Sequence, residues 1–183
     1  MPAEIDYNHP VHNLWIILDQ TYVATSKCQE AAFAKAGLTL QQYRVLMVIN
    51  FAQHPVTQTD MARWLDRNAN SISLIIDRME KSGLVKRVRD LKDRRALRLT
   101  MTAKGEELFK RATAYGLELE ERMLSCYSEE ETKLVTELLG KLRGRALAEL
   151  VPKEADRDNR TDSPPDIAHH HMTKTGKGKK LHP

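Results

Sequence analysis

The fold of this 183-residue chain rests on the stretch Arg67-Asn-Ala-Asn-Ser-Ile-Ser-Leu-Ile-Ile-Asp-Arg-Met-Glu-Lys-Ser-Gly83. Asn is favoured at a helix N-cap and Gly just beyond a helix end, so Asn68 and Gly83 mark the two ends of one predicted helix. Apolar residues recur between them at i, i+3, i+4 and i+7, a spacing that puts them on one stripe facing a core. They are Ile72, Ile75, Ile76 and Met79.

The opposite face of this helix is mostly polar or charged. It carries Asn70, Ser71, Ser73, Leu74, Asp77, Arg78 and Lys81. Since the isoleucine stripe must face inward, we expect these side chains to face outward.

The flanking segments predict a helix before this one and a hairpin after it. Thr57 and Asp60 suit a capping box that opens a shorter helix. Residues 84–89 and 96–101 are β-prone runs separated by a charged loop, which is typical of a β-hairpin. Val56 is a candidate for a brief strand that pairs with this hairpin.

This order of elements resembles the MarR-type winged helix-turn-helix regulators over about residues 13–150. The resemblance is carried by Asp77-Arg-Met-Glu-Lys-Ser-Gly-Leu-Val, by Asp93-Arg-Arg and by Met101-Thr-Ala-Lys-Gly. It implies a mainly α fold with a small β-hairpin wing and a helical dimerisation region built from both ends of the chain. Many relatives have a basic residue in the first turns of the recognition helix, where this chain has Leu74, so their base preference cannot be carried over.

The positive charge of the chain is concentrated in the expected helix-turn-helix and wing. Residues 57–101 hold eleven Lys and Arg against six Asp and Glu, whereas the net charge of the whole chain is +4. A cationic surface of this kind suits a polyanionic partner, and double-stranded DNA is the expected one. The alternative is a basic face that is merely solvated.

The outward side chains of the central helix are candidates for reading DNA in the major groove. Asn70 and Ser73 suit base edges, and Leu74 suits a thymine methyl, although it could also pack on a neighbouring loop. Asp77 is expected to pair with Lys81 or to accept from a cytosine amino group. Contacts to phosphates, which position a protein without reading sequence, are assigned to Thr57, Thr59, Ser71, Arg78 and Lys81.

The resemblance assigns the tip of the wing to the minor groove. It implies that Arg95 enters the groove and that Asp93 holds it by a charge-assisted hydrogen bond, with Arg94 as the competing choice. Arg95→Ala should then weaken operator binding and reduce its salt dependence.

The chain divides into four regions. Residues 1–12 are expected to form an N-terminal arm, residues 37–101 the DNA-binding domain, and residues 151–183 a disordered polar and basic tail. Helices over 13–36 and 102–150 carry apolar stripes that predict a homodimer, and a two-fold dimer implies an inverted-repeat operator. The alternative is that these helices pack within one monomeric bundle.

The resemblance also implies a small-molecule effector, often an aromatic acid, bound between the dimer helices and the DNA-binding head. The candidate lining residues, which could equally be ordinary core, are Trp15, Tyr22, Tyr43, Met47 and His54. Cys28 raises the alternative of a redox-sensing regulator, because some relatives respond to peroxide through a cysteine in the first helix.

Other classes of protein are disfavoured. The chain has neither a Gly-rich phosphate loop nor a nucleophile motif, so we expect no enzyme activity and no cofactor. The run His169-His-His in the tail lacks the surroundings of a physiological metal site. Two cysteines, no apolar run of about 20 residues and no signal peptide predict a cytoplasmic protein that does not enter membranes. A winged helix that contacts only proteins is the remaining alternative to a repressor.

Overall fold

The computed structural model describes residues 9–52, 56–65, 67–89 and 97–150, and within these ranges the protein is mainly helical with a small sheet, as predicted. The elements are α1 (Pro10–Ala34), α2 (Leu40–Phe51), β1 (Val56–Thr57), α3 (Gln58–Trp64), α4 (Ala69–Lys81), β2 (Val85–Arg89), β3 (Leu97–Met101), α5 (Ala103–Leu124) and α6 (Glu129–Leu150).

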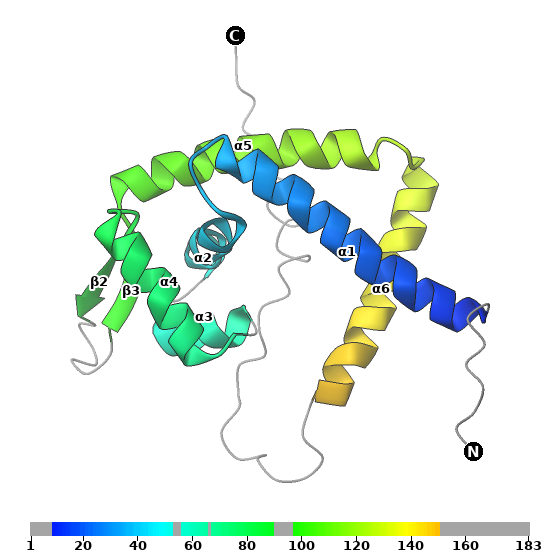
Figure 1. Ribbon diagram of the computed structural model, residues 1–183, viewed down its shortest axis with the longest axis horizontal. Helices are drawn as coiled ribbons and strands as arrows, with labels where there is room; N and C mark the ends of the chain where they lie inside the picture. Colours follow the sequence, from blue (N-terminus) through cyan, green and yellow to red (C-terminus); the bar gives the residue numbers. More distant parts are fainter. Residues whose placement is uncertain (1–8, 53–55, 66, 90–96, 151–183) are drawn as a thin grey trace.

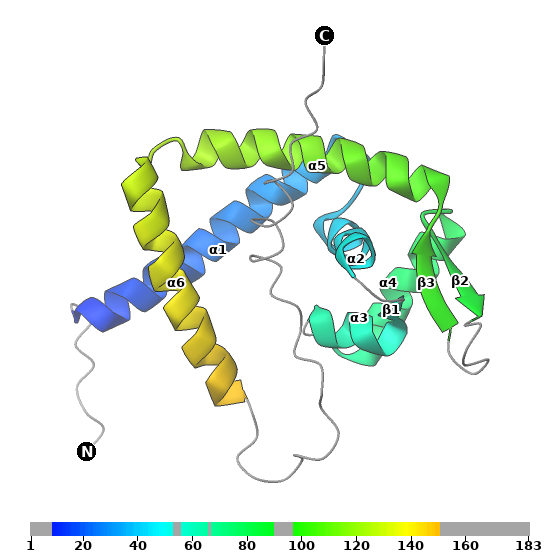
Figure 2. The ribbon, with the colours of Figure 1, turned by 180° about the vertical axis from the view of Figure 1, so that it is seen from behind.

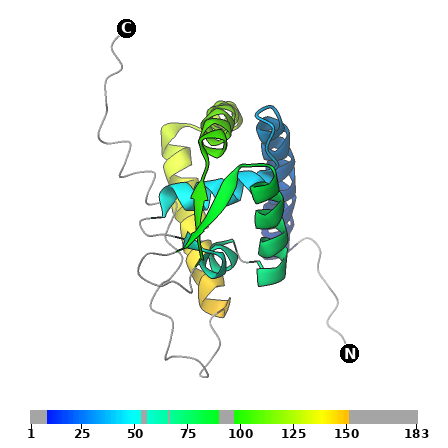
Figure 3. The same ribbon diagram turned by 90° about the vertical axis from the view of Figure 1, so that its left-hand side faces the viewer.

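The long helices form a frame that carries a smaller head at one end. In Figure 1, α5 runs along the top, α1 passes diagonally beneath it, and α2 lies under both. The head consists of α3, α4 and the sheet, while α6 turns away from the end of α5 and projects at the opposite side (Figures 1 and 2). Seen from the head, the strands stand between α4 at one side, α3 below and α5 above (Figure 3).

The sheet has the strand order β1-β3-β2, and both pairings are antiparallel. Val56 is opposite Leu99 in one pair, and Arg87 is opposite the same Leu99 in the other. The brief strand expected at Val56 is therefore confirmed. It joins the segment before the helix-turn-helix to the hairpin that follows it.

The core of the head forms where α2, α3, α4 and the sheet meet. The side chains with the least exposure in it are Val45, Leu46, Val48, Val56, Met61, Ile72, Ile76, Met79 and Val85, each exposed by 1% or less. Full burial of one such side chain contributes about 1.5–3 kcal/mol. This core holds α4 with its isoleucine side inward.

The first helix begins earlier than predicted, so the arm expected over residues 1–12 is too long at its C-terminal end. Pro10 is the first residue of α1, and His9 caps the helix by accepting a hydrogen bond from the N–H of Val11 at 3.3 Å. Proline suits this position because the first helical N–H has no partner inside the helix. The helix ends at Ala34, and Gly37 reverses the chain with φ = +80°.

The start of α5 is attached to the turn that follows α4. Thr102 caps α5, and its hydroxyl donates to the carbonyl of Gly83 at 2.6 Å. Lys104 Nζ donates to the carbonyl of Ser82 at 2.9 Å. Gly105 leaves room for the carbonyl of Leu84, because a Cβ there would lie 2.0 Å from that oxygen. The Thr-x-Lys-Gly motif thus joins the frame to the head.

Candidate nucleic-acid interface

Helix α4 has the ends and the buried side that its sequence predicts. Asn68 caps it by accepting from the N–H of Ser71 at 2.8 Å, and Gly83 lies beyond its end with φ = +71°. Ile72, Ile76 and Met79 are fully buried, while Ile75 is half-buried. The opposite side of α4 is consequently turned to solvent.

The residues of α4 that are predicted to meet DNA lie on this outer side or at its border. Asn70, Arg78 and Lys81 are exposed, and Leu74 is 58% exposed, which is high for a leucine inside a helix. Ser71 and Ser73 are half-buried at the border. The helix therefore presents amide, hydroxyl, cationic and one apolar group on a single accessible face.

Asp77 differs from its prediction, because its partner is Arg87 of β2 and not Lys81 one turn further along the helix. Arg87 Nη2 donates to Asp77 Oδ1 at 2.5 Å, and Arg87 Nη1 donates to Glu80 Oε2. Arg87 lies close enough to bind Asp77 because β2 folds back along α4. Since its carboxylate is occupied, Asp77 is a poor candidate for accepting from a cytosine.

Arg87 and Glu80 are the interface residues that the sequence interpretation missed. Two signals point to them: the acids at 77 and 80 share one side of a helix, and Arg87 lies two residues after the buried Val85, on the same face of β2. Burial by itself would lower the pKa of Arg87, but the hydrogen bonds to Asp77 and Glu80 outweigh it and raise the pKa. The guanidinium therefore stays charged.

Of the two residues near α3 that are predicted to contact phosphates, one caps the helix instead. The hydroxyl of Thr57 accepts from the N–H of Asp60 at 3.2 Å and donates to Asp60 Oδ2 at 2.7 Å. Thr59, the second residue of α3, is exposed. The hydroxyl of Thr57 is thus committed to capping, whereas that of Thr59 faces solvent.

The hairpin adds further exposed cations to the head. Lys86 and Arg89 of β2 are exposed. Within the described parts of residues 57–101, eight Lys and Arg stand against three acids. The predicted minor-groove residues Asp93, Arg94 and Arg95 lie outside the described residues, so their assignment stays a prediction.

The described residues among those predicted to line an effector pocket differ in their surroundings. Trp15 and Tyr22 of α1 are 67% and 58% exposed, and Met47 packs against the core. Tyr43 stacks between Phe33 and Phe109, with ring centroids 4.0 and 5.3 Å away. Trp15 and Tyr22 are thus left exposed while Tyr43 is enclosed, a difference that the helical period alone does not reveal. His54 lies outside the described residues.

Both tyrosines have specific polar neighbours. A hydrogen bond and the charge of Arg44 lower the pKa of Tyr22, with a smaller contribution from Ser26. Burial raises the pKa of Tyr43, and its hydroxyl lies 3.3 Å from Thr113 Oγ1. Because Thr113 donates its own proton to the carbonyl of Phe109, Tyr43 is the donor in this pair.

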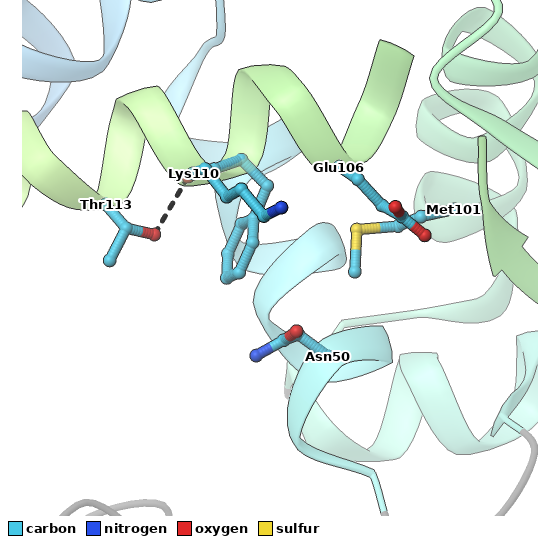
Figure 4. A pocket seen from close by; sticks show the side chains of 6 residues that line it. Asn50, Met101, Glu106, Lys110 and Thr113 are labelled. Atoms are coloured by element: carbon cyan, nitrogen blue, oxygen red, sulfur yellow. Dashed lines mark hydrogen bonds between the residues drawn. The ribbon is translucent and has the colours of Figure 1, made fainter. Parts of the chain in front are cut away.

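An open groove lies instead between the C-terminal end of α2, strand β3 and the first half of α5. Its volume is about 510 Å³, and it is lined by Asn50, Met101, Glu106, Phe109, Lys110 and Thr113 (Figure 4). A second hollow of about 380 Å³ shares Asn50, Met101 and Glu106 with it. The lining combines apolar side chains with an amide, an acid and a cation.

Large apolar side chains are exposed on the frame helices. On α1 and α5 they include Val11, Leu14, Trp15, Ile17, Tyr22, Leu117 and Leu124, and on α6 they are Leu134, Leu138, Leu139, Leu142 and Leu147. The leucines of α6 are 37–55% exposed. Within the described chain α1 packs against α5 and α2, whereas α6 turns away from them and leaves its leucines exposed.

The remaining expectations concern the cysteines, metal ligands and membrane spans. Cys28 and Cys126 are free and exposed. Across the described ranges, no three His, Cys, Asp or Glu side chains gather as metal ligands, and His169–His171 fall outside them. Among the described helices, none combines the length and apolar character needed to cross a bilayer.

Comparison with known proteins agrees with this geometry. Residues 36–96 match the model of the MarR family. The HTH-type transcriptional regulator BilQ of Clostridium symbiosum is 31% identical over 121 residues, which are 66% of this chain and 83% of that protein.

Solved structures share the fold at lower identity. The ligand-free organohalide-sensing regulator RdhR has a TM-score of 0.69 at 22% identity, covering 82% of this chain and 90% of that one. A mutant MarR from E. coli, complexed with operator DNA, has a TM-score of 0.67 at 18% identity, covering 76% and 99%. The family model and these relatives agree with the capped recognition helix and the wing. The chain therefore belongs to the MarR family of winged helix-turn-helix transcriptional regulators.

Proposed function

We propose that this chain represses transcription as a homodimer that binds an inverted-repeat operator in double-stranded DNA. One observation carries the proposal: the polar side of α4 is exposed beside a ribbon with exposed cations, while Ile72, Ile76 and Met79 on its other side are buried in the core. An α-helix fits the major groove of B-DNA, where each base pair presents its own pattern of donors and acceptors. The wing then lies over the adjacent backbone and minor groove.

The exposed residues divide into those that read bases and those that hold the backbone. Asn70 and Ser73 are assigned to base edges, and Leu74 to a thymine methyl, which suits an exposed leucine. The phosphate contacts are assigned to Thr59, Ser71, Arg78 and Lys81.

The exposed apolar side chains of α1, α5 and α6 support the homodimer. So many large apolar side chains on a surface are unfavourable in water unless another surface covers them. A second copy of the chain supplies a matching surface by two-fold symmetry. The two recognition helices would then meet successive major grooves about 34 Å apart.

The groove between α2, β3 and α5 supports an effector that is a phenol or an aromatic acid. Phe109 and Met101 offer apolar surface, and Lys110 offers a charge for a phenolate or carboxylate. RdhR, which shares the fold, has also been solved in a 2,4-dichlorophenol-bound form. Release from DNA requires that the effector bind one spacing of the two heads more tightly than the other.

The test is footprinting of the purified full chain on the DNA that flanks its own gene. We expect two protected segments one helical turn apart, and a loss of protection as 2,4-dichlorophenol is added. If the protein binds no duplex even at low salt, a winged helix that contacts proteins replaces this function. Retained protection at saturating phenol would remove only the effector.

A further inference from the structure

The recognition helix is tied to the wing strand through one arginine. Asp77 and Glu80 are three residues apart on α4, so they share one side of the helix, and Arg87 of β2 contacts both. We propose that Arg87 is a positioning residue for DNA binding, which braces β2 against α4 so that recognition helix and wing meet DNA as one rigid unit. This inference rests on the proposed DNA-binding function.

Three contacts make the brace. The two terminal nitrogens of the guanidinium go to different acids, Nη2 to Asp77 at 2.5 Å and Nη1 to Glu80. The main-chain N–H of Arg87 also donates to Glu80, at 3.1 Å. Glu80 therefore holds both the backbone and the side chain of the same strand residue, and the side chain spans nearly one turn of the helix.

The brace acts at the open edge of the sheet. Because the strand order is β1-β3-β2, β2 has a strand neighbour on one side only. An edge strand leaves unpaired N–H groups along its free side, and the carboxylate of Glu80 takes one of them. Val85 anchors the beginning of β2 in the core, and Arg87 extends that attachment toward the wing.

The same contacts argue against Arg87 as a direct phosphate ligand. Its side chain is only 20% exposed, and both terminal nitrogens are already bound to carboxylates. Lys86 and Arg89, by contrast, are exposed on either side of it along the strand. Arg87 therefore acts on DNA through the position of its neighbours.

The test begins with Arg87→Met in the full chain, which keeps the apolar stem and removes the guanidinium. We expect operator affinity, measured by fluorescence anisotropy well below the unfolding midpoint, to fall about tenfold per folded dimer. We also expect the β2 amides of the free protein to exchange faster. Arg87→Lys should recover only part of the affinity, because one ammonium group cannot reproduce the fork of a guanidinium. Lys86→Met is the matched control, since it removes the same charge from β2 and should leave amide exchange unchanged.

A second comparison separates bracing from simple neutralisation of the acids. In the triple variant Arg87→Met/Asp77→Asn/Glu80→Gln the acids are neutral but the brace is absent, so affinity should stay about tenfold below wild type. Recovery of wild-type affinity in this variant would overturn the proposal, and so would unchanged affinity and exchange in Arg87→Met alone. If the wild-type chain binds no duplex, the proposed function fails, and amide exchange still decides whether Arg87 holds the strand.

Discussion

Replacing Gly105 by alanine should destabilise the protein strongly, because this residue lies where the start of α5 touches the turn after α4. The added Cβ would lie 2.0 Å from the carbonyl oxygen of Leu84 and 3.0 Å from its carbonyl carbon. Both atoms belong to the main chain, so no side-chain rotation can relieve the overlap. The helix and the turn must move apart.

The magnitude follows from what this movement disturbs. A non-bonded contact needs about 3.5 Å, so the two segments must separate by more than an ångström. That distance weakens the hydrogen bonds from Thr102 N to Leu84 O, 3.1 Å, and from Lys104 Nζ to Ser82 O, 2.9 Å. Each contributes about 1 kcal/mol, and overpacking adds about 2 kcal/mol. Alanine regains about 1 kcal/mol of helix propensity, which leaves a net loss of about 3 kcal/mol.

Urea unfolding monitored by circular dichroism measures this loss. Wild type and variant must be compared at one protein concentration, because association makes the midpoint depend on concentration. Gly144→Ala in α6 is the control: its Cβ meets nothing within 4 Å, and it should stabilise the protein by up to about 1 kcal/mol. A midpoint for Gly105→Ala at or above that of wild type would refute the tight approach of α5 to the turn.

Three further substitutions test the recognition helix and the frame. Asn68→Ala removes the cap of α4 and should cost about 1 kcal/mol of stability in a thermal or urea melt, with weaker operator binding because the first turn frays. Leu74→Ala should leave stability within about 0.5 kcal/mol, since the side chain is 58% exposed, yet change preference at one base pair in a set of single-substituted operators; a uniform loss across the set would contradict this role. Leu138→Glu should convert dimers to monomers in sedimentation experiments, because it would bury a charge in the proposed interface, and an unchanged dimer would exclude this face of α6.

The features that the sequence predicted well are those decided by neighbours along the chain. The cap of α4 at Asn68 and the turn at Gly83 depend on residues within a few positions of the helix ends. The burial of Ile72, Ile76 and Met79 follows from their spacing. The start of α1 is an exception although its signals are local: a proline suggests an irregular arm, yet Pro10 is the first residue of the helix.

The effector site was predicted poorly for a different reason. The expected lining residues come from the first two helices, but a residue's place on a helix does not say which other element will lie over it. Tyr43 is enclosed by Phe33 and Phe109, whereas Trp15 is left exposed. The groove that does form takes most of its lining from α5, a segment that the prediction did not include.

By itself, the sequence determined the helical frame, the outward face of the recognition helix and the position of the hairpin, because periodicity and capping act over a few residues. Only the tertiary structure decided which acidic side chain pairs with which basic side chain, and where the groove between α2, β3 and α5 lies. Arg87 binds Asp77 and Glu80 because β2 folds back beside α4. Gly105 is required because the carbonyl of Leu84 approaches it from 21 positions earlier in the chain. Such contacts depend on how whole elements dock, which no short window of residues encodes.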